Sequence, residues 1–223
     1  MAISLGTRTS GPGKWAGMGR CLGGIILCLH GATAAGSLTG GFKFEKAPPS
    51  VALVYFVEET STGSSPCPVV DQKDKKFVHK MLVGRSGCRI QFRNSDNVDH
   101  NIYSKDPKSG VDFDAGLLPP GQTSQTVMNW DPDAVIKIGC KIHPKMQAYI
   151  ANVSSRYYQI VEFKPSEREA AFTLEKVPDK LTKIKIWFPK QDPIDAELKT
   201  GEAKQWQILE KGEPAGVLSL SRP

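Results

Sequence analysis

The stretch Gly139-Cys-Lys-Ile-His-Pro-Lys-Met146 gathers a thiol, an imidazole and a thioether in one short segment. Cys140, His143 and Met146 follow a Cys-x2-His-x2-Met spacing. All three side chains are softer ligands than a carboxylate, so the set favours copper over calcium or magnesium. A compact loop at the end of a strand can direct all three toward one point. The segment therefore predicts a metal site in a β-rich protein.

A fourth ligand has to come from elsewhere, and His100 is the candidate because it begins its own expected strand. Two His, one Cys and a weakly bonded Met form an electron-transfer copper site. A structural zinc site would need a second Cys/His pair, which the sequence lacks. A Cys and His three residues apart rarely align as nucleophile and base. The remaining alternative is a buried Cys and Met that flank an exposed His.

The chain outside this segment is all-β in character. Short runs rich in Val, Ile, Phe and Thr are separated by turn residues, which is typical of sandwiches and barrels. We expect an N-terminal β-hairpin and linker over residues 35–66, a first sandwich over 67–153 and a smaller β-sandwich over 154–223. The hairpin consists of the strands Gly41–Phe44 and Val51–Val57. It could pair with the first sandwich or, alternatively, with the C-terminal unit.

Residues 1–34 have the pattern of a secretory signal peptide. They contain no acid, their apolar run Cys21–Leu29 follows three basic residues, and Ala32-Thr-Ala34 is a small-x-small cleavage site. The run is too short to span a bilayer. We therefore expect a periplasmic or secreted protein, with membrane attachment only if Cys28 carries a lipid.

Removal of this segment changes both the charge and the cysteine count. The formal net charge of +6 falls to +3, and no dense basic patch with aromatics remains, so nucleic-acid binding loses its support. Three cysteines are left, and an oxidising compartment favours pairing. If Cys140 binds metal, Cys67 and Cys88 are a candidate disulfide. The alternative is that both are small buried apolar residues.

The region from Val69 to Val153 resembles the cupredoxins, the plastocyanin and amicyanin type of blue-copper protein. The matching segments are Phe77–Val83 with Gly87, Ile90–Asp96, His100–Ser104, Phe113–Gly116, Pro119–Gly121 and Gly139–Met146. The whole chain is most similar to exported methylamine-utilisation-type cupredoxin-like proteins. Residues 154–223 resemble a carboxypeptidase-regulatory-like β domain. The resemblance implies a Greek-key cupredoxin sandwich followed by the smaller sandwich.

The resemblance also implies a role for each site residue. His100 and His143 would bind a single type 1 copper ion through imidazole nitrogens, Cys140 through its thiolate and Met146 through a weak axial contact. Asn101 would pin the ligand loop and donate toward the sulfur. Pro144 would stiffen the loop.

These roles predict an electron carrier and no enzyme. Copper oxidases and nitrite reductases need further His clusters, and His79 alone remains, which we expect to be a surface or hydrogen-bonded histidine. The expected partners are redox proteins that bind transiently. They would bind near His143, whose imidazole edge would be the port through which electrons enter and leave. The alternative is a copper-binding or docking module that holds metal without shuttling electrons.

Overall fold

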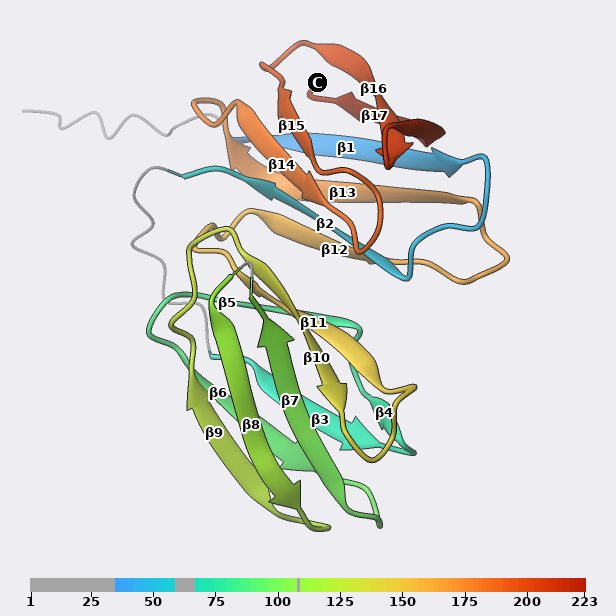
Figure 1. The fold of residues 1–223 in the computed structure, drawn as a ribbon. Coiled ribbons are helices and arrows are strands. Elements are labelled where there is room, and N and C mark those ends of the chain that lie inside the picture. Colours follow the sequence, from blue (N-terminus) through green and yellow to red (C-terminus); the bar gives the residue numbers. More distant parts are fainter. Residues whose placement is uncertain (1–34, 59–66, 108) are drawn as a thin grey trace, which may run out of the picture. The chain divides into compact units, whose positions relative to one another are not determined.

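The computed structural model describes residues 35–58, 67–107 and 109–223, and this part of the chain is built of strands alone. Seventeen strands form four sheets (Figure 1). The all-β fold class is therefore as the sequence predicts. The expected signal peptide lies outside the described residues. Among the described residues, no helix could cross a membrane.

Two of the sheets contain the strands between residues 69 and 152. One has the strand order β5-β11-β10-β7-β8 and the other β4-β3-β6-β9. Strands close in sequence are often not neighbours in these sheets, as in a Greek-key sandwich. The strands are β3 (Val69–Lys73), β4 (Lys76–Phe77), β5 (Met81–Gly84), β6 (Arg89–Asn94), β7 (His100–Asp106), β8 (Val111–Leu118), β9 (Thr123–Val127), β10 (Val135–Cys140) and β11 (Gln147–Asn152).

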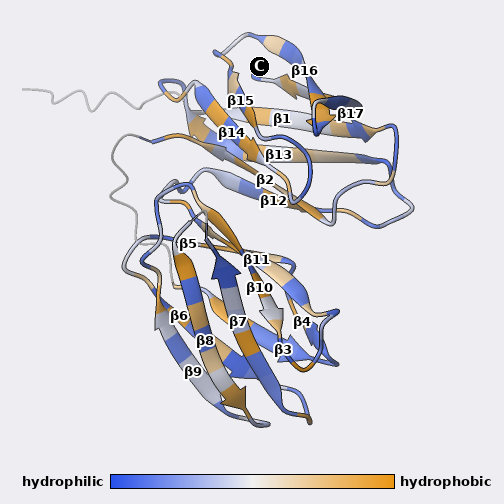
Figure 2. Ribbon diagram, in the orientation of Figure 1, coloured by the Kyte–Doolittle hydropathy of each residue, from blue (hydrophilic) through white to orange (hydrophobic). Residues whose placement is uncertain are grey.

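The core of this sandwich follows from period-two alternation. On β10, Ile136, Ile138 and Cys140 are buried while Lys137 points to solvent. Figure 2 shows hydrophobic and hydrophilic residues alternating along the first half of β8. Because side chains on a strand alternate between faces, the alternation that buries the isoleucines also turns Cys140 inward. The sulfur thus lies at the buried end of a core strand.

A disulfide joins Cys67 and Cys88. Each cysteine lies just before a strand, and these strands, β3 and β6, pair in parallel. The bond therefore ties together two strand starts that only a long crossover connects. Cys140 is left as a buried free cysteine.

The other two sheets have the strand orders β13-β1-β17-β16 and β12-β2-β14-β15. They combine the first two strands of the described chain with the last six. The strands are β1 (Ala35–Phe44), β2 (Val51–Phe56), β12 (Tyr158–Glu162), β13 (Glu169–Pro178), β14 (Lys183–Trp187), β15 (Ile194–Glu197), β16 (Ala203–Glu210) and β17 (Glu213–Ser221).

The predicted N-terminal hairpin is wrong. β1 pairs with β13 and β17, whereas β2 pairs with β12 and β14 in the other sheet. The reason lies in Val51–Phe56, where all six residues are buried. Such a strand needs cover on both faces, and a lone hairpin provides too little. Residues 154–223 are thus completed by β1 and β2, and β3–β11 are inserted between β2 and β12.

The two faces of β2 enter different cores. Ala52, Val54 and Phe56 pack among the strands of their own sandwich. Val51, Leu53 and Tyr55 lie in a second buried cluster that also includes side chains of β5 and β11, among them Met81 and Ala151. A ring contact of 5.0 Å between Tyr149 and Trp187 belongs to this region.

Candidate metal centre

Three of the predicted ligands converge at one end of the β3–β11 sandwich. His100 is the first residue of β7, Cys140 is the last of β10, and His143 lies in the following loop. β7 and β10 are antiparallel neighbours, with Cys140 opposite Ile102. The start of one strand therefore lies beside the end of the other, which brings together residues forty positions apart in the sequence.

The donor atoms form a small triangle. His100 Nδ1 and His143 Nδ1 are 3.2 Å apart, and each is 3.7 Å from the Sγ atom of Cys140. A triangle of these dimensions has its centre about 2 Å from each corner, close to the ~2.0–2.3 Å over which an ion such as zinc binds nitrogen and sulfur. Cys140 and His100 are buried and His143 is half-buried. The three residues therefore fit one soft transition-metal ion.

Met146 lies in the same buried apolar cluster as Cys140. Its backbone N–H donates to the His143 carbonyl at 2.9 Å, which closes the loop into a tight turn. Both sulfur residues also line a cavity of about 210 Å³. The fourth predicted ligand thus shares a buried cluster and a cavity lining with Cys140.

The two predicted supporting residues have different roles in the structure. Asn101 donates its backbone N–H to the Cys140 sulfur at 3.4 Å and accepts the Lys141 N–H at 3.1 Å. Its side chain does not reach the ligand loop but donates to Asp114 at 2.8 Å. Pro144 is exposed directly after His143, where its ring restricts the backbone of the loop.

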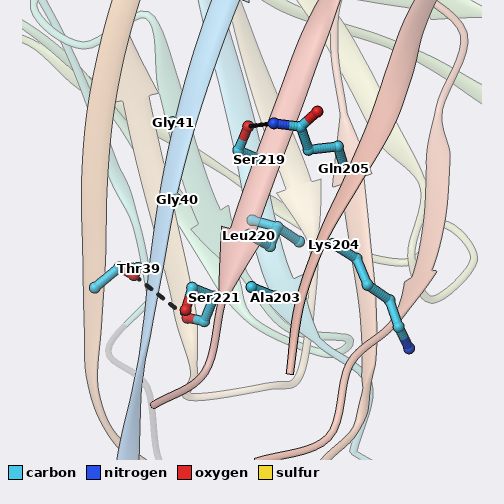
Figure 3. Close-up of a pocket in the computed structure, with 9 residues that line it drawn as sticks. All are labelled: Thr39, Gly40, Gly41, Ala203, Lys204, Gln205, Ser219, Leu220 and Ser221. Carbon is cyan, nitrogen blue, oxygen red and sulfur yellow. Dashed lines mark hydrogen bonds between the residues drawn. The ribbon is translucent and has the colours of Figure 1, made fainter. Parts of the chain in front are cut away.

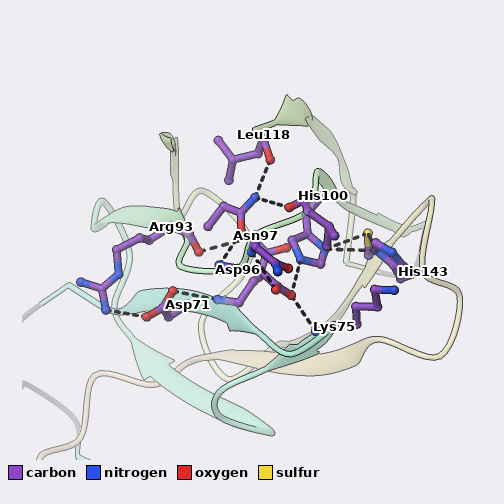
Figure 4. Close-up of polar contacts among 12 residues, drawn as sticks. Asp71, Lys75, Arg93, Asp96, Asn97, His100, Leu118 and His143 are labelled. Carbon is purple, nitrogen blue, oxygen red and sulfur yellow. Dashed lines mark hydrogen bonds and ion pairs between the residues drawn. The ribbon is translucent and has the colours of Figure 1, made fainter. Parts of the chain in front are cut away.

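Asp96 is a site residue that the sequence did not single out. Its Oδ2 atom lies 3.1 Å from His100 Nε2 and accepts the Lys75 backbone N–H at 2.7 Å (Figure 4). The hydrogen bond from Lys75 contributes most to holding the pKa of this carboxyl below its usual range. An ionised Asp96 keeps the proton of His100 on Nε2 and leaves Nδ1 free for a metal. The sequence offered one signal for this contact, which is that Asp96 lies four residues before His100.

The surroundings of His143 favour the neutral form of its imidazole. Burial lowers the pKa of this imidazole, and the neighbouring charge of His100 and that of Lys75 lower it further. A neutral imidazole has a free lone pair, whereas a protonated one cannot act as a ligand.

A wider hollow lies over another sheet, which contains none of the predicted ligands. It has a volume of about 670 Å³ and lies over β1, β16 and β17. Figure 3 shows that small and polar residues line it, with hydrogen bonds from Gln205 to Ser219 and from Thr39 to Ser221. None of its lining residues is a His, Cys, Asp or Glu, so it offers no metal site.

No protein-family model matches the chain, and no curated protein matches it. Its structural neighbours are cupredoxins. A purple cupredoxin from Nitrosopumilus maritimus is 21% identical, covers 39% of this chain and 98% of its own, and has a TM-score of 0.33. An amicyanin from Paracoccus versutus is 15% identical, with 45% and 96% covered and a TM-score of 0.33. A reduced Cu(I) form of an amicyanin mutant is 17% identical, with 45% and 97% covered and a TM-score of 0.34.

Proposed function

We propose that this protein is a cupredoxin-like electron carrier that holds one type 1 copper ion with His100, Cys140, His143 and Met146. The observation that supports the proposal best is the buried triangle of two imidazole nitrogens and one thiol sulfur. Two His, one Cys and a nearby Met are the donor set of electron-transfer copper sites. Bound copper would supply a one-electron couple between Cu(II) and Cu(I).

The chain's own residues would fix the ligands in place. His100 and Cys140 belong to neighbouring strands, so the sheet hydrogen bonds hold them at a set separation. Asp96 orients the His100 ring, and the Asn101 N–H withdraws electron density from the sulfur. A site that is rigid in this way changes little when the charge of the ion changes, which favours rapid electron transfer.

The proposed electron port is the His143 edge. His143 is half-buried, and two apolar side chains near the site are unusually exposed, Ile142 at 50% and Leu117 at 61%. Leu117 is opposite Asn101 on the adjacent strand. A small apolar patch suits transient redox partners, whose interfaces are small. Lys141 and Lys145 flank His143 in the sequence and would steer acidic partners.

We further propose that the chain acts after export to the periplasm or the cell exterior and that it is not an enzyme. The disulfide between Cys67 and Cys88 suits an oxidising compartment.

A second candidate function is a copper-binding or docking module without electron shuttling. The second sandwich favours it, because that unit would be available to bind another protein.

The deciding experiment is visible spectroscopy of the protein from Ala35 onward, loaded with Cu(II). We expect an intense thiolate-to-copper band that disappears on reduction, one copper per chain, and reversible one-electron voltammetry. The Cys140→Ser variant should lose the band. A band without reversible voltammetry would favour the docking module, and the lack of any band in the wild type would refute the copper site.

A further inference from the structure

β8 contains a bulge next to the candidate site. Asn101 is opposite Leu117, but Tyr103 is opposite Asp114, so the register between β7 and β8 shifts within this short interval. Gly116 has φ +73°, a conformation that glycine adopts readily, and its N–H donates to Asp114 Oδ1 at 2.9 Å. Bulges re-aim side chains next to functional sites. Here the bulge directs Asp114 toward β7 and the ligand loop.

Asp114 binds two residues that each follow a predicted ligand. Its Oδ1 atom accepts the side-chain amide of Asn101 at 2.8 Å, and Oδ2 accepts the ammonium of Lys141. Asn101 follows His100 and Lys141 follows Cys140. The hydrogen bond from Lys141, followed by those from Gly116 and Asn101, lowers the pKa of Asp114 to about 2. The carboxylate is therefore ionised at neutral pH.

The same two residues also contact each other and the thiol. The Asn101 backbone N–H donates to the Cys140 sulfur, and its carbonyl accepts the Lys141 N–H at 3.1 Å. The Asn101 Oδ1 atom is buried and has no hydrogen-bond partner among the described residues. Its side-chain amide N–H donates instead to Asp114. One carboxylate thus ties the strand of the first histidine to the loop after the cysteine.

We propose that Asp114 is a positioning residue that keeps the ligand loop closed over Cys140. This inference rests on the proposed function, in which Cys140 is the thiolate ligand. Asp114 and Lys141 have side chains that are 42% and 54% exposed. An ion pair that exposed contributes little to global stability. Its effect is local: it holds Asn101 and Lys141 in the positions that keep the N–H on the sulfur and the thiol out of solvent.

The test uses the metal-free protein from Ala35 onward and measures the alkylation rate of Cys140, which is 2% exposed. Reaction requires local opening, so the rate reports the closed fraction of the loop. The variants are Asp114→Ala and Asp114→Asn, with Asp112→Ala on the same strand as the control. Both Asp114 variants remove the charge, but only asparagine keeps an oxygen acceptor for Asn101 and Gly116.

We expect Asp114→Ala to react about tenfold faster than Asp114→Asn, the factor that corresponds to about 1.4 kcal/mol. Asp112→Ala should react like the wild type. Amide hydrogen exchange at Lys141 should accelerate in parallel, while the unfolding midpoint changes only slightly. Equal rates for the alanine and asparagine variants, with unchanged exchange at Lys141, would overturn the proposal. The test needs no copper, so its outcome is separate from failure of the wild type to form a copper site.

Discussion

His100 Nε2 lies 3.1 Å from Asp96 Oδ2, while Nδ1 of the same ring faces the sulfur of Cys140. The two nitrogens therefore have separate tasks, one as a donor to a carboxylate and one as the proposed ligand atom. Such outer hydrogen bonds orient metal-binding histidines and raise their basicity. The carboxylate in turn is held by the backbone N–H groups of Lys75 and Asn97.

The first prediction concerns Asp96→Ala. Without the carboxylate, the proton of His100 is no longer confined to Nε2, so copper affinity should fall by about 10- to 100-fold. Competition with a chelator of known affinity measures the change. Asp99→Ala is the control, because Asp99 precedes His100 directly but the structure shows no hydrogen bond between the two side chains. An unchanged affinity in Asp96→Ala would contradict the role of the carboxylate.

A second prediction concerns the axial position. Met146→Gln replaces a soft thioether with a harder oxygen or nitrogen donor, which favours Cu(II) over Cu(I). The reduction potential should therefore decrease, as measured by voltammetry. Met128→Leu changes another buried methionine of the same core and is expected to leave the potential close to that of the wild type. If both variants shifted the potential equally, Met146 would not be a ligand.

A third prediction uses the titration of Asp114. Its pKa is about 2 in the folded protein, below the usual value for an aspartate. The ionised group therefore stabilises the fold above its unfolded pKa, and this contribution is lost as pH falls through the folded pKa. Because the pair is exposed, the difference from Asp114→Asn should be under about 1 kcal/mol at pH 6 and should fall to a small fraction of that near pH 2. Urea unfolding of the metal-free protein at both pH values measures it, and a difference that grows on acidification would contradict the ion pair.

A fourth prediction concerns the disulfide. Changing both Cys67 and Cys88 to Ala should lower the free energy of unfolding by about 3 kcal/mol, since the bond closes a loop of 21 residues. Denaturant unfolding gives the value. Copper binding should persist in native buffer, because neither residue is among the predicted ligands. A double variant as stable as the wild type would show that the bond does not form in solution.

A fifth prediction concerns Arg222, which is only 1% exposed. Its guanidinium donates to the carbonyls of Pro178, Leu181 and Leu198 and lies 5.3 Å from the Phe56 ring. Arg222→Met removes the guanidinium from all three carbonyls, of which that of Pro178 keeps the Leu181 N–H, and should cost about 2–4 kcal/mol of stability.

Thermal or urea unfolding checks this prediction, with Arg168→Met as the matched control. Arg168 also donates to a backbone carbonyl, that of Glu45, but the contact is exposed. The control should therefore change stability by less than about 1 kcal/mol. If both variants lost the same free energy of unfolding, burial of the Arg222 side chain would not explain its contribution.

The sequence pointed to the candidate ligand loop because the relevant information is local. The spacing of Cys140, His143 and Met146 can be read directly, and the position of His100 at a strand start supplied the distant donor. Asp96 and Asp114 could not be found in the same way. Asp96 depends on the β3–β4 turn, and Asp114 depends on a bulge in β8. Both are set by strand register, which the residue pattern alone does not specify.

The strand pairing of the N-terminal region shows the same limit. The sequence predicted a strand over Val51–Val57 and paired it in a hairpin with its neighbour Gly41–Phe44. The partners of β1 and β2 instead lie more than a hundred residues further along the chain. Sequence proximity favours a hairpin, whereas the two faces of β2 are buried in two different clusters that a hairpin could not supply, and burial prevails.

The insertion of β3–β11 has a consequence for how the candidate copper unit is attached. The chain leaves the second sandwich after β2 and returns to it at β12, and these two strands are antiparallel partners, with Tyr55 opposite Tyr158. Entry and exit are therefore adjacent, as at sites where whole domains are accepted into a host fold. A unit joined by two adjacent strands is tethered at two points, so it cannot swivel about a single covalent hinge as a domain on one linker can.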